Sequence, residues 1–399
     1  MVQDMWDAGV DESILDDVVR LDAADPSGML PQVASSARQV RESAALAREV
    51  GVDSLAADGR PRAVLVAGTG TSAAVGDALA AVAGSRCPVP VLGHNGFGLP
   101  GWVGVTDVVI AISGSGRDEA ALSALEEADR RGCRTVAVGL PDSPLAHRAG
   151  RARALFLPAP VADGRPTRAG FWALLLPAVA VVRALGLLPS AAEGPEAVEA
   201  AAVRLEDLAV RCRPASETFI SPAKVLALEL AGSLPLLWGT TALTAAAASR
   251  AAGQLAANAG YPALLGTLPD SASLQAGVLD GPFGVRGADG GPAEDFFRDR
   301  VDDGAEPVRL RLVLLRDQAA EHPTVTRQAE AAVTAAAERA VAVTELSAQG
   351  ASRLERLASL VGLFDYTSVY LALALGVDPT PVAAARDLSA PPTPAVRET

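Results

Sequence analysis

The sequence predicts an α/β protein with two doubly wound domains in tandem, each a parallel sheet with helices on both faces. The 399 residues suffice for two domains of ordinary size. Short apolar runs alternate with helical segments, which is typical of parallel strands joined by helices. This alternation occurs twice, on either side of residues 188–197, where Pro, Gly and Ser indicate a domain boundary.

The first half of the chain begins with helices and continues with strands that alternate with helices. The first sixty residues are predicted to be helical, because apolar positions recur at helical spacing over 27–51. After them we expect strands at 61–68, 87–93, 106–113 and 134–140, and helices at 72–84, 118–132 and 168–187.

The second half repeats the pattern. We expect strands at 234–239, 261–266, 309–317 and 341–346, and helices at 242–258, 324–338 and 351–375. Residues 281–307 are rich in Gly, Pro and Asp, so we expect an exposed loop there. These patterns divide the chain into a helical segment (1–50), a first domain (51–190), a linker helix region (191–214), a second domain (215–387) and a Pro-rich tail (388–399) that we expect to be disordered.

Composition and charge exclude several classes of protein. The formal net charge is −13 and aromatic residues make up 4% of the chain, so we expect neither a basic surface nor stacking platforms for nucleic acid. The acidic N-terminus does not resemble a secretory signal, and the longest apolar stretch, 169–182, is too short to span a bilayer. We therefore expect a cytoplasmic protein that binds neither nucleic acid nor a membrane.

The spacing of cysteines and histidines does not indicate a metal site. Three Cys and three His are scattered along the chain, without a CxxC or HExxH pattern. The cysteines are therefore interpreted as reduced core residues. We predict no metal and no cofactor.

A glycine loop, residues 68–77 (GTGTSAAVGD), joins the first predicted strand to a helix and includes Gly70 and Ser72. Backbone amides and the helix dipole at such a junction favour an anion. The G-x-G-x-x-A spacing also fits the dinucleotide fingerprint, so an NAD site is an alternative. That site needs a carboxylate about twenty residues further on, and the second strand ends instead at residues 92–95 (LGHN).

A serine loop, residues 113–119 (SGSGRDE), follows the third predicted strand and opens a helix. The hydroxyls of Ser113 and Ser115, the flexible Gly114 and the helix start form a cradle for a terminal phosphate, with which Arg117 can pair. An ordinary strand-to-helix turn is the alternative for this loop alone, since Ser and Gly are usual turn residues. Two such loops in one sheet favour a binding crevice at the carboxyl ends of the strands.

Four segments together resemble the bifunctional phosphoglucose/phosphomannose isomerase family, whose members carry two sugar-isomerase (SIS) domains. These segments are the glycine loop, the serine loop with its helix (113–132), residues 166–169 (PTRA) and residues 365–382. The resemblance covers residues 30–390. It implies two SIS domains, a phosphorylated hexose as ligand, Arg168 facing the sugar, and a homodimer, in which the Ala-rich helices 242–257 and 328–340 would pack closely against a partner.

The chain departs from the family at the positions where the resemblance implies catalytic groups. The family's catalytic glutamate falls on Ala257, its ring-opening histidine on Ser273 and a lysine on Ser389. Aldose–ketose isomerisation needs a base that carries a proton between C1 and C2, and an acid–base group that opens the ring. Neither alanine nor serine can do this near neutral pH.

Glu119, Asp270 and His94 are the candidate replacements for these groups. Each also has an ordinary interpretation, as a helix-start carboxylate, a turn or cap residue and a surface loop residue respectively. Two hypotheses therefore stay open.

The first hypothesis is an active isomerase of hexose 6-phosphates with replacement acid–base groups. The second is a non-catalytic phosphosugar sensor or regulatory protein that kept the pocket. Both imply that Ser72, Ser113 and Ser115 hold the phosphate and that Arg168 lies near the sugar. The residues at the catalytic positions favour weak or lost activity.

Overall fold

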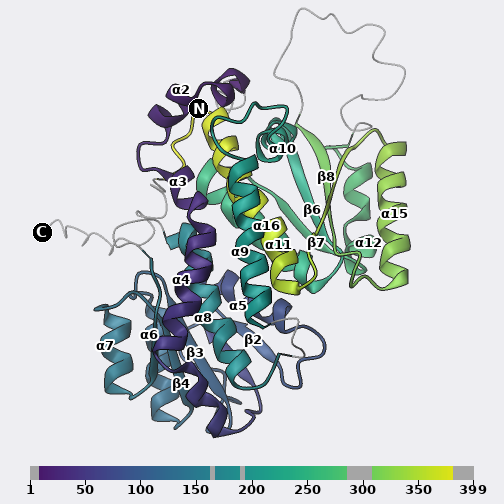
Figure 1. The fold of residues 1–399 in the computed structure, drawn as a ribbon. Coiled ribbons are helices and arrows are strands. Elements are labelled where there is room, and N and C mark those ends of the chain that lie inside the picture. Colours follow the sequence, from purple (N-terminus) through teal and green to yellow (C-terminus); the bar gives the residue numbers. More distant parts are fainter. Residues whose placement is uncertain (1–8, 162–166, 189–193, 285–307, 381–399) are drawn as a thin grey trace, which may run out of the picture.

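The computed structural model describes residues 9–161, 167–188, 194–284 and 308–380 and shows two α/β halves joined by a layer of helices (Figure 1). Within these residues, the first sheet has five parallel strands in the order β2-β1-β3-β4-β5, and the second has four in the order β7-β6-β8-β9. The predicted fold class, two parallel-sheet α/β domains in tandem, is confirmed.

The first sheet is built as the apolar runs predict, with one strand more. Its strands are β1 (Val64–Ala67), β2 (Val91–His94), β3 (Val108–Ser113), β4 (Arg134–Gly139) and β5 (Leu155–Pro158). The strand β5 and the helix before it, α7 (Pro144–Arg151), were not predicted. Because the order reverses beside β1, the loops after β1 and β3 meet at a topological switch point, the usual place for a ligand in such sheets.

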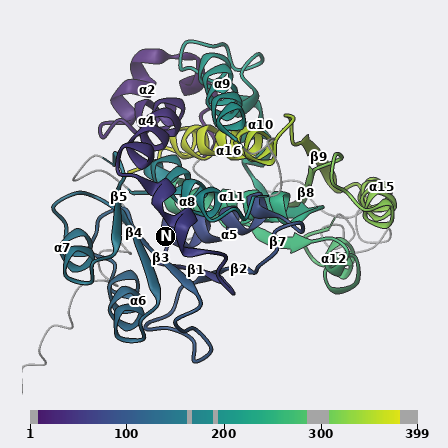
Figure 2. The same ribbon diagram turned by 60° about the horizontal axis from the view of Figure 1, so that its bottom comes forward.

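Both faces of the first sheet are covered, as Figure 2 shows. Alternate residues of β3 point to opposite faces. Val108 and Ile110 pack with α5 (Thr71–Ala83) and α8 (Phe171–Ala184). Val109 and Ala111 pack with α6 (Glu119–Arg130) and α7. A strand buried on both faces explains the continuous apolar run in the sequence.

The second domain repeats this plan after the helix α9 (Pro195–Arg211), which occupies much of the region predicted as a linker. Its strands are β6 (Ser233–Gly239), β7 (Leu264–Thr267), β8 (Arg309–Arg316) and β9 (Ala342–Ser347). Its helices are α10 (Pro222–Leu230), α11 (Ala242–Ala259), α12 (Asp270–Leu274), η5 (Ala276–Asp280), α15 (Pro323–Glu338) and α16 (Arg353–Ala374). A capping box of Thr241 and Thr244 begins α11, and the left-handed Gly260 ends it.

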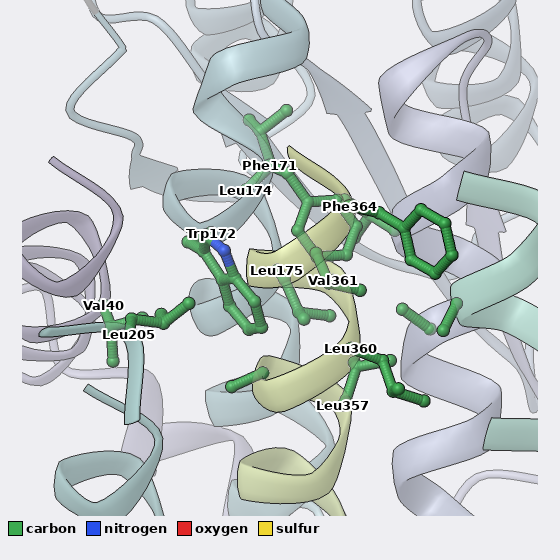
Figure 3. Packing of buried hydrophobic residues seen from close by; sticks show 14 of the residues in the cluster. Val40, Phe171, Trp172, Leu174, Leu175, Leu205, Leu357, Leu360, Val361 and Phe364 are labelled. Carbon is green, nitrogen blue, oxygen red and sulfur yellow. The ribbon is translucent and has the colours of Figure 1, made fainter. Parts of the chain in front are cut away.

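A single apolar core joins the two domains. Side chains from α4 (Ser36–Glu49), α8, α9 and α16 converge in it, as Figure 3 shows for Val40, Trp172, Leu205 and Leu360. Phe171 and Trp172 of α8 pack edge to face, with ring centroids 5.2 Å apart. Because helices from both halves fill one core, the strand ends of the first domain are held at a fixed position relative to α11 and α16.

The N-terminal segment is helical, as predicted, and its elements are η1 (Glu12–Asp16), α2 (Val18–Ala24), α3 (Met29–Ala34), α4 and η2 (Val52–Asp58). The fully buried Lys224 of α10 binds this segment to the second domain. Its ammonium group donates hydrogen bonds to the carbonyl oxygens of Leu15, Pro214 and Ser216. Most of the predicted loop 281–307 and the predicted tail lie outside the described residues.

Among the described residues, α16 is long and apolar enough to cross a membrane by length and composition. Its most apolar window is 89% buried inside the protein. Such burial is the pattern of a core helix, and α16 packs against α9, α10 and α11.

Candidate functional site

The glycine loop runs from β1 into α5 and needs its first glycine for steric reasons. The Gly68 amide donates a hydrogen bond to the His94 carbonyl oxygen (3.1 Å). A Cβ atom at position 68 would lie 2.5 Å from the Ile112 carbonyl oxygen and 2.6 Å from the Ser72 Cβ atom. This packing holds Ser72, a buried residue in the first turn of α5, against the end of β3.

The serine loop connects β3 to α6 through two side-chain hydrogen bonds to its own backbone. The hydroxyl of Ser113, which is almost fully buried, accepts a hydrogen bond from the Asp118 amide (3.2 Å). The Ser115 hydroxyl accepts one from the Arg117 amide (3.3 Å). Ser115 and Arg117 are exposed and Gly114 is buried, so the loop presents one hydroxyl and one guanidinium group outward.

Asp118 joins the two loops, and the sequence analysis missed it. Its Oδ1 atom accepts a hydrogen bond from the Ala120 amide (3.0 Å) and thereby caps α6. Its Oδ2 atom accepts hydrogen bonds from the amide (2.7 Å) and the hydroxyl (3.0 Å) of Thr69 in the glycine loop. An Asp before a predicted helix is a common N-cap signal, but the contact with Thr69 is visible only in the fold.

Gly116 is required by a close contact between the serine loop and Ser143, the N-cap residue of α7. Its φ of +67° lies in the left-handed region, and a Cβ atom there would approach the Ser143 Oγ atom to 2.1 Å. Gly132, at the end of α6, has a similar φ of +69°, and a Cβ atom there would meet nothing within 4 Å. An alanine at either position would therefore meet the same backbone strain, and only at position 116 would its Cβ atom also clash with a neighbour.

We expect Gly116→Ala to destabilise the protein more than Gly132→Ala. Both variants force alanine into the left-handed region, and Gly116→Ala also displaces Ser143, at a cost of about 1–3 kcal/mol for a close-packed site. Urea denaturation of both variants measures the difference. Equal losses of stability would contradict the packing of this loop.

Two of the candidate acid–base residues lie in the first domain and the third in the second. Glu119 is exposed in the first turn of α6, beside the serine loop. His94 ends β2, and its Nε2 atom donates a hydrogen bond to the Gly98 carbonyl oxygen (3.1 Å). Asp270 is exposed at the start of α12, and both views place α12 far from α6 (Figures 1 and 2). Asp270 thus belongs to a different part of the molecule from Glu119.

Arg168 lies between the two domains and is partly buried. Its Nε atom donates a hydrogen bond to Asn258 Oδ1 of α11 (2.6 Å), and a terminal nitrogen donates to the Pro379 (2.5 Å) and Thr380 (2.8 Å) carbonyl oxygens. Burial lowers the pKa of the Arg168 guanidinium, and the Asp378 carboxylate opposes this. Arg168 therefore connects η3 (Thr167–Gly170) to the second domain.

A buried ion pair contacts the backbone of Arg168. Arg250 of α11 donates to both carboxylate oxygens of Asp365 of α16 (2.8 and 2.9 Å), and each side chain is 5% exposed. The same Arg250 nitrogen donates to the Arg168 carbonyl oxygen (3.1 Å). The guanidinium also lies 4.1 Å from the centre of the Phe171 ring, a cation–π contact across the domains.

Two of the positions that the resemblance assigns to the missing catalytic groups are also on the second domain. Ala257 lies on α11, half-buried, directly before Asn258. Ser273 is exposed on α12. Ser389 lies outside the described residues. Because α11 packs against α5, the helix that carries Ala257 adjoins the helix that follows the glycine loop.

The equivalent switch point of the second domain, between β6 and β8, is filled by the chain's own charged side chains. Arg316 pairs with Glu321 (2.7 Å) and Asp317 with Arg356 (3.0 Å), and all four side chains are at most 9% exposed. Burial raises the pKa of the Glu321 carboxyl, but hydrogen bonds from Arg316 and other partners outweigh this and lower it.

The sequence of the second half matches a known protein family. Residues 219–390 match the bacterial phosphoglucose isomerase C-terminal SIS domain. Over 321 residues, the chain is 27% identical to a bifunctional phosphoglucose/phosphomannose isomerase of Caldicellulosiruptor bescii, covering 80% of this chain and 86% of that protein. These matches support a relation to the SIS phosphosugar isomerases.

Solved structures show the same fold. A hypothetical protein from Thermus thermophilus has a TM-score of 0.67 at 15% identity, over 94% of each chain. The tagatose-6-phosphate ketose/aldose isomerase of Escherichia coli has a TM-score of 0.61 at 14% identity, over 89% of this chain and 96% of that one. The two α/β halves thus share the fold of these structures, and the match of residues 219–390 is consistent with two SIS domains in tandem.

Proposed function

We propose that this tandem SIS protein binds a hexose 6-phosphate between the glycine and serine loops of its first domain and interconverts hexose phosphates weakly or not at all. The proposal of phosphosugar binding rests on one observation. The two loops follow adjacent strands, β1 and β3, at the starts of α5 and α6, where backbone amides and helix dipoles favour an anion.

Side-chain chemistry supports a phosphate with a sugar attached. Ser72, Ser113 and Ser115 supply hydroxyl groups along the two loops, and Arg117 supplies an exposed cation in the serine loop. Relatives that are named as phosphosugar isomerases support a hexose 6-phosphate as the ligand class. In this proposal Arg168, at the domain interface, lies near the sugar.

Lost or weak activity is the second part of the proposal. The resemblance puts Ala257 at the position of the catalytic base and Ser273 at the position of the acid–base group that opens the sugar ring. Neither side chain transfers protons near neutral pH. The candidate replacements Glu119 and Asp270 lie on different domains. A sensor or regulatory protein that responds to phosphosugars fits this arrangement.

We expect millimolar fructose 6-phosphate to raise the melting temperature, because a ligand that binds only the folded state stabilises it. The double change Ser113→Ala, Ser115→Ala should abolish the rise, since it removes both hydroxyls of the serine loop. Unphosphorylated fructose serves as the ligand control. Thermal denaturation measures both effects, and no shift with any hexose 6-phosphate would refute the binding proposal.

We also propose a homodimer in the cytoplasm. The edge strand β7 exposes Leu264 and Leu265, and Leu274 of the following α12 is 83% exposed. Covering such apolar side chains with a second copy would remove them from water. Light scattering at micromolar concentration should give twice the 40.5 kDa mass of one chain. A monomer would contradict this.

A further inference from the structure

We propose that a cavity between the helices α4, α8 and α9 is a further anion site, which binds a phosphate monoester with a short apolar organic part. The groups that hold the phosphate are the guanidinium groups of Arg48 and Arg183. The site goes beyond the proposed function, because none of its residues belongs to the glycine loop or the serine loop.

The cavity has a volume of about 320 Å³, within the range of small-molecule sites. It lies where α4 meets α8 and α9, three helices that also fill the core between the two domains (Figure 1). Three of its seven lining residues are arginines, although the chain has 47 acidic residues and only 34 Lys and Arg. The cavity is therefore rich in cations in an acidic protein.

Arg41, the first of these arginines, is occupied by the chain's own carboxylates. Its guanidinium donates to Glu199 (2.6 Å) and Glu206 (2.5 Å) of α9, through Nε and both terminal nitrogens. Glu199 is the only acidic side chain among the described residues that line the cavity. Because Arg41 neutralises Glu199, this carboxylate opposes an incoming anion only weakly.

Arg48 and Arg183 remain available to a ligand. In the part of the chain that the structure describes, neither forms an ion pair with a carboxylate, and the Arg48 Nε atom donates to the Ala44 carbonyl oxygen (3.3 Å). Arg183 is half-buried in the last turn of α8, and Arg48 is exposed in the last turn of α4. Guanidinium groups bind phosphate oxygens through paired, charge-assisted hydrogen bonds.

An arginine in the last turn of a helix also has an ordinary role, because it stabilises the negative end of the helix dipole. That role explains Arg48 and Arg183 one at a time. It does not explain why both line the same cavity, where their like charges repel each other. A phosphate dianion between them neutralises both charges.

The remaining walls indicate the organic part of the ligand. Ala44, Pro195 and Val198 are apolar, and the polar groups of Arg41 and Glu199 are bound to each other. The hydroxyl groups of a hexose would therefore be buried without hydrogen-bond partners, which costs binding free energy. A short apolar chain fits these walls, so the site discriminates against hexose 6-phosphates.

Isothermal titration with propyl phosphate in low-salt buffer tests the site. The Ser113→Ala, Ser115→Ala variant is the background, so that the serine loop does not contribute. Adding Arg48→Met and Arg183→Met should weaken binding at least about tenfold, because charge-assisted hydrogen bonds are lost while the apolar stems are kept.

The matched control adds Arg86→Met and Arg213→Met to the same background. It also removes two positive charges, from exposed residues that do not line the cavity, and should bind propyl phosphate like the background. Propanol is the ligand control for the phosphate group, and fructose 6-phosphate is the control for the apolar part. Both should bind the background variant more weakly than propyl phosphate.

Three results would overturn the site: no binding of propyl phosphate by the background variant, equal affinity after Arg48→Met and Arg183→Met, or fructose 6-phosphate bound by the background as tightly as propyl phosphate. The proposed function fails in a different way. Its failure is the absence of fructose 6-phosphate binding by Arg48→Met, Arg183→Met protein with intact loops, whatever the result with propyl phosphate.

Discussion

Replacing Arg250 by methionine should cost about 3–5 kcal/mol of unfolding free energy, the usual loss when one partner of a buried ion pair is removed. The variant leaves the Asp365 carboxylate buried with Gln254 as its remaining side-chain partner. It also removes the guanidinium from the face of Phe171 and from the Arg168 carbonyl oxygen. Urea denaturation measures the loss.

An exposed pair on the same protein is the control. Arg211 and Asp207 of α9 lie 3.5 Å apart, with side chains about half exposed, so Arg211→Met should cost about 0–1 kcal/mol. The double variant Arg250→Met, Asp365→Asn should recover part of the loss, because no unpaired charge then stays buried. If Arg250→Met were as mild as Arg211→Met, the buried pair would not contribute the expected stability.

The loss should depend on pH. Burial raises the pKa of the Asp365 carboxyl from 3.8, while Arg250 opposes the rise, so Arg250→Met should raise this pKa further. Between the unfolded and the folded pKa, the folded state then holds more protons than the unfolded state, and stability falls as pH rises. The deficit of Arg250→Met relative to wild type should therefore be smaller at pH 5 than at pH 8.

Isomerase turnover is expected to stay below about 1 s⁻¹, the low end of ordinary enzymes, for glucose, mannose and fructose 6-phosphates. The loss of one general acid–base group typically costs about 10²–10⁴ in rate. Losing several groups that act as a unit leaves little beyond positioning. Coupled assays of the purified protein measure this, with the Caldicellulosiruptor bescii relative as the positive control.

Faster turnover would contradict the proposed loss of activity and would require a replacement base. Glu119→Gln and Asp270→Asn would then identify it, because each removes a carboxylate without changing its shape. Glu119→Gln should be tested first, since Glu119 ends the serine loop, whereas Asp270 lies on the second domain. Loss of turnover in only one variant would assign the base.

The sequence predicted the parts of the fold that depend on local patterns. Strands such as β3 and β8 are long apolar runs, and α6 and α16 carry clear helical spacing, so their positions differ from prediction by a few residues. β5 was missed because its four residues are only partly buried, end at Pro158 and follow an Arg- and Ala-rich stretch. Short strands depend on pairing with a neighbour, here β4.

The site was predicted less completely, because much of it joins distant residues. Ser72, Ser113 and Ser115 follow from loop chemistry next to strands and helices. The bridge from Asp118 to Thr69 spans 49 residues and the pair of Arg250 and Asp365 spans 115. Contacts between residues so far apart in the sequence form only when sheets and helices assemble, and the local spacing of residues does not encode them.

The most direct test of phosphosugar binding by the first domain is a crystal structure of the wild-type protein with saturating fructose 6-phosphate. We expect the phosphate between residues 68–72 and 113–118, within hydrogen-bond distance of the Ser113 and Ser115 hydroxyls. A phosphate bound in the second domain, or fructose 6-phosphate absent from both loops at saturation, would contradict it.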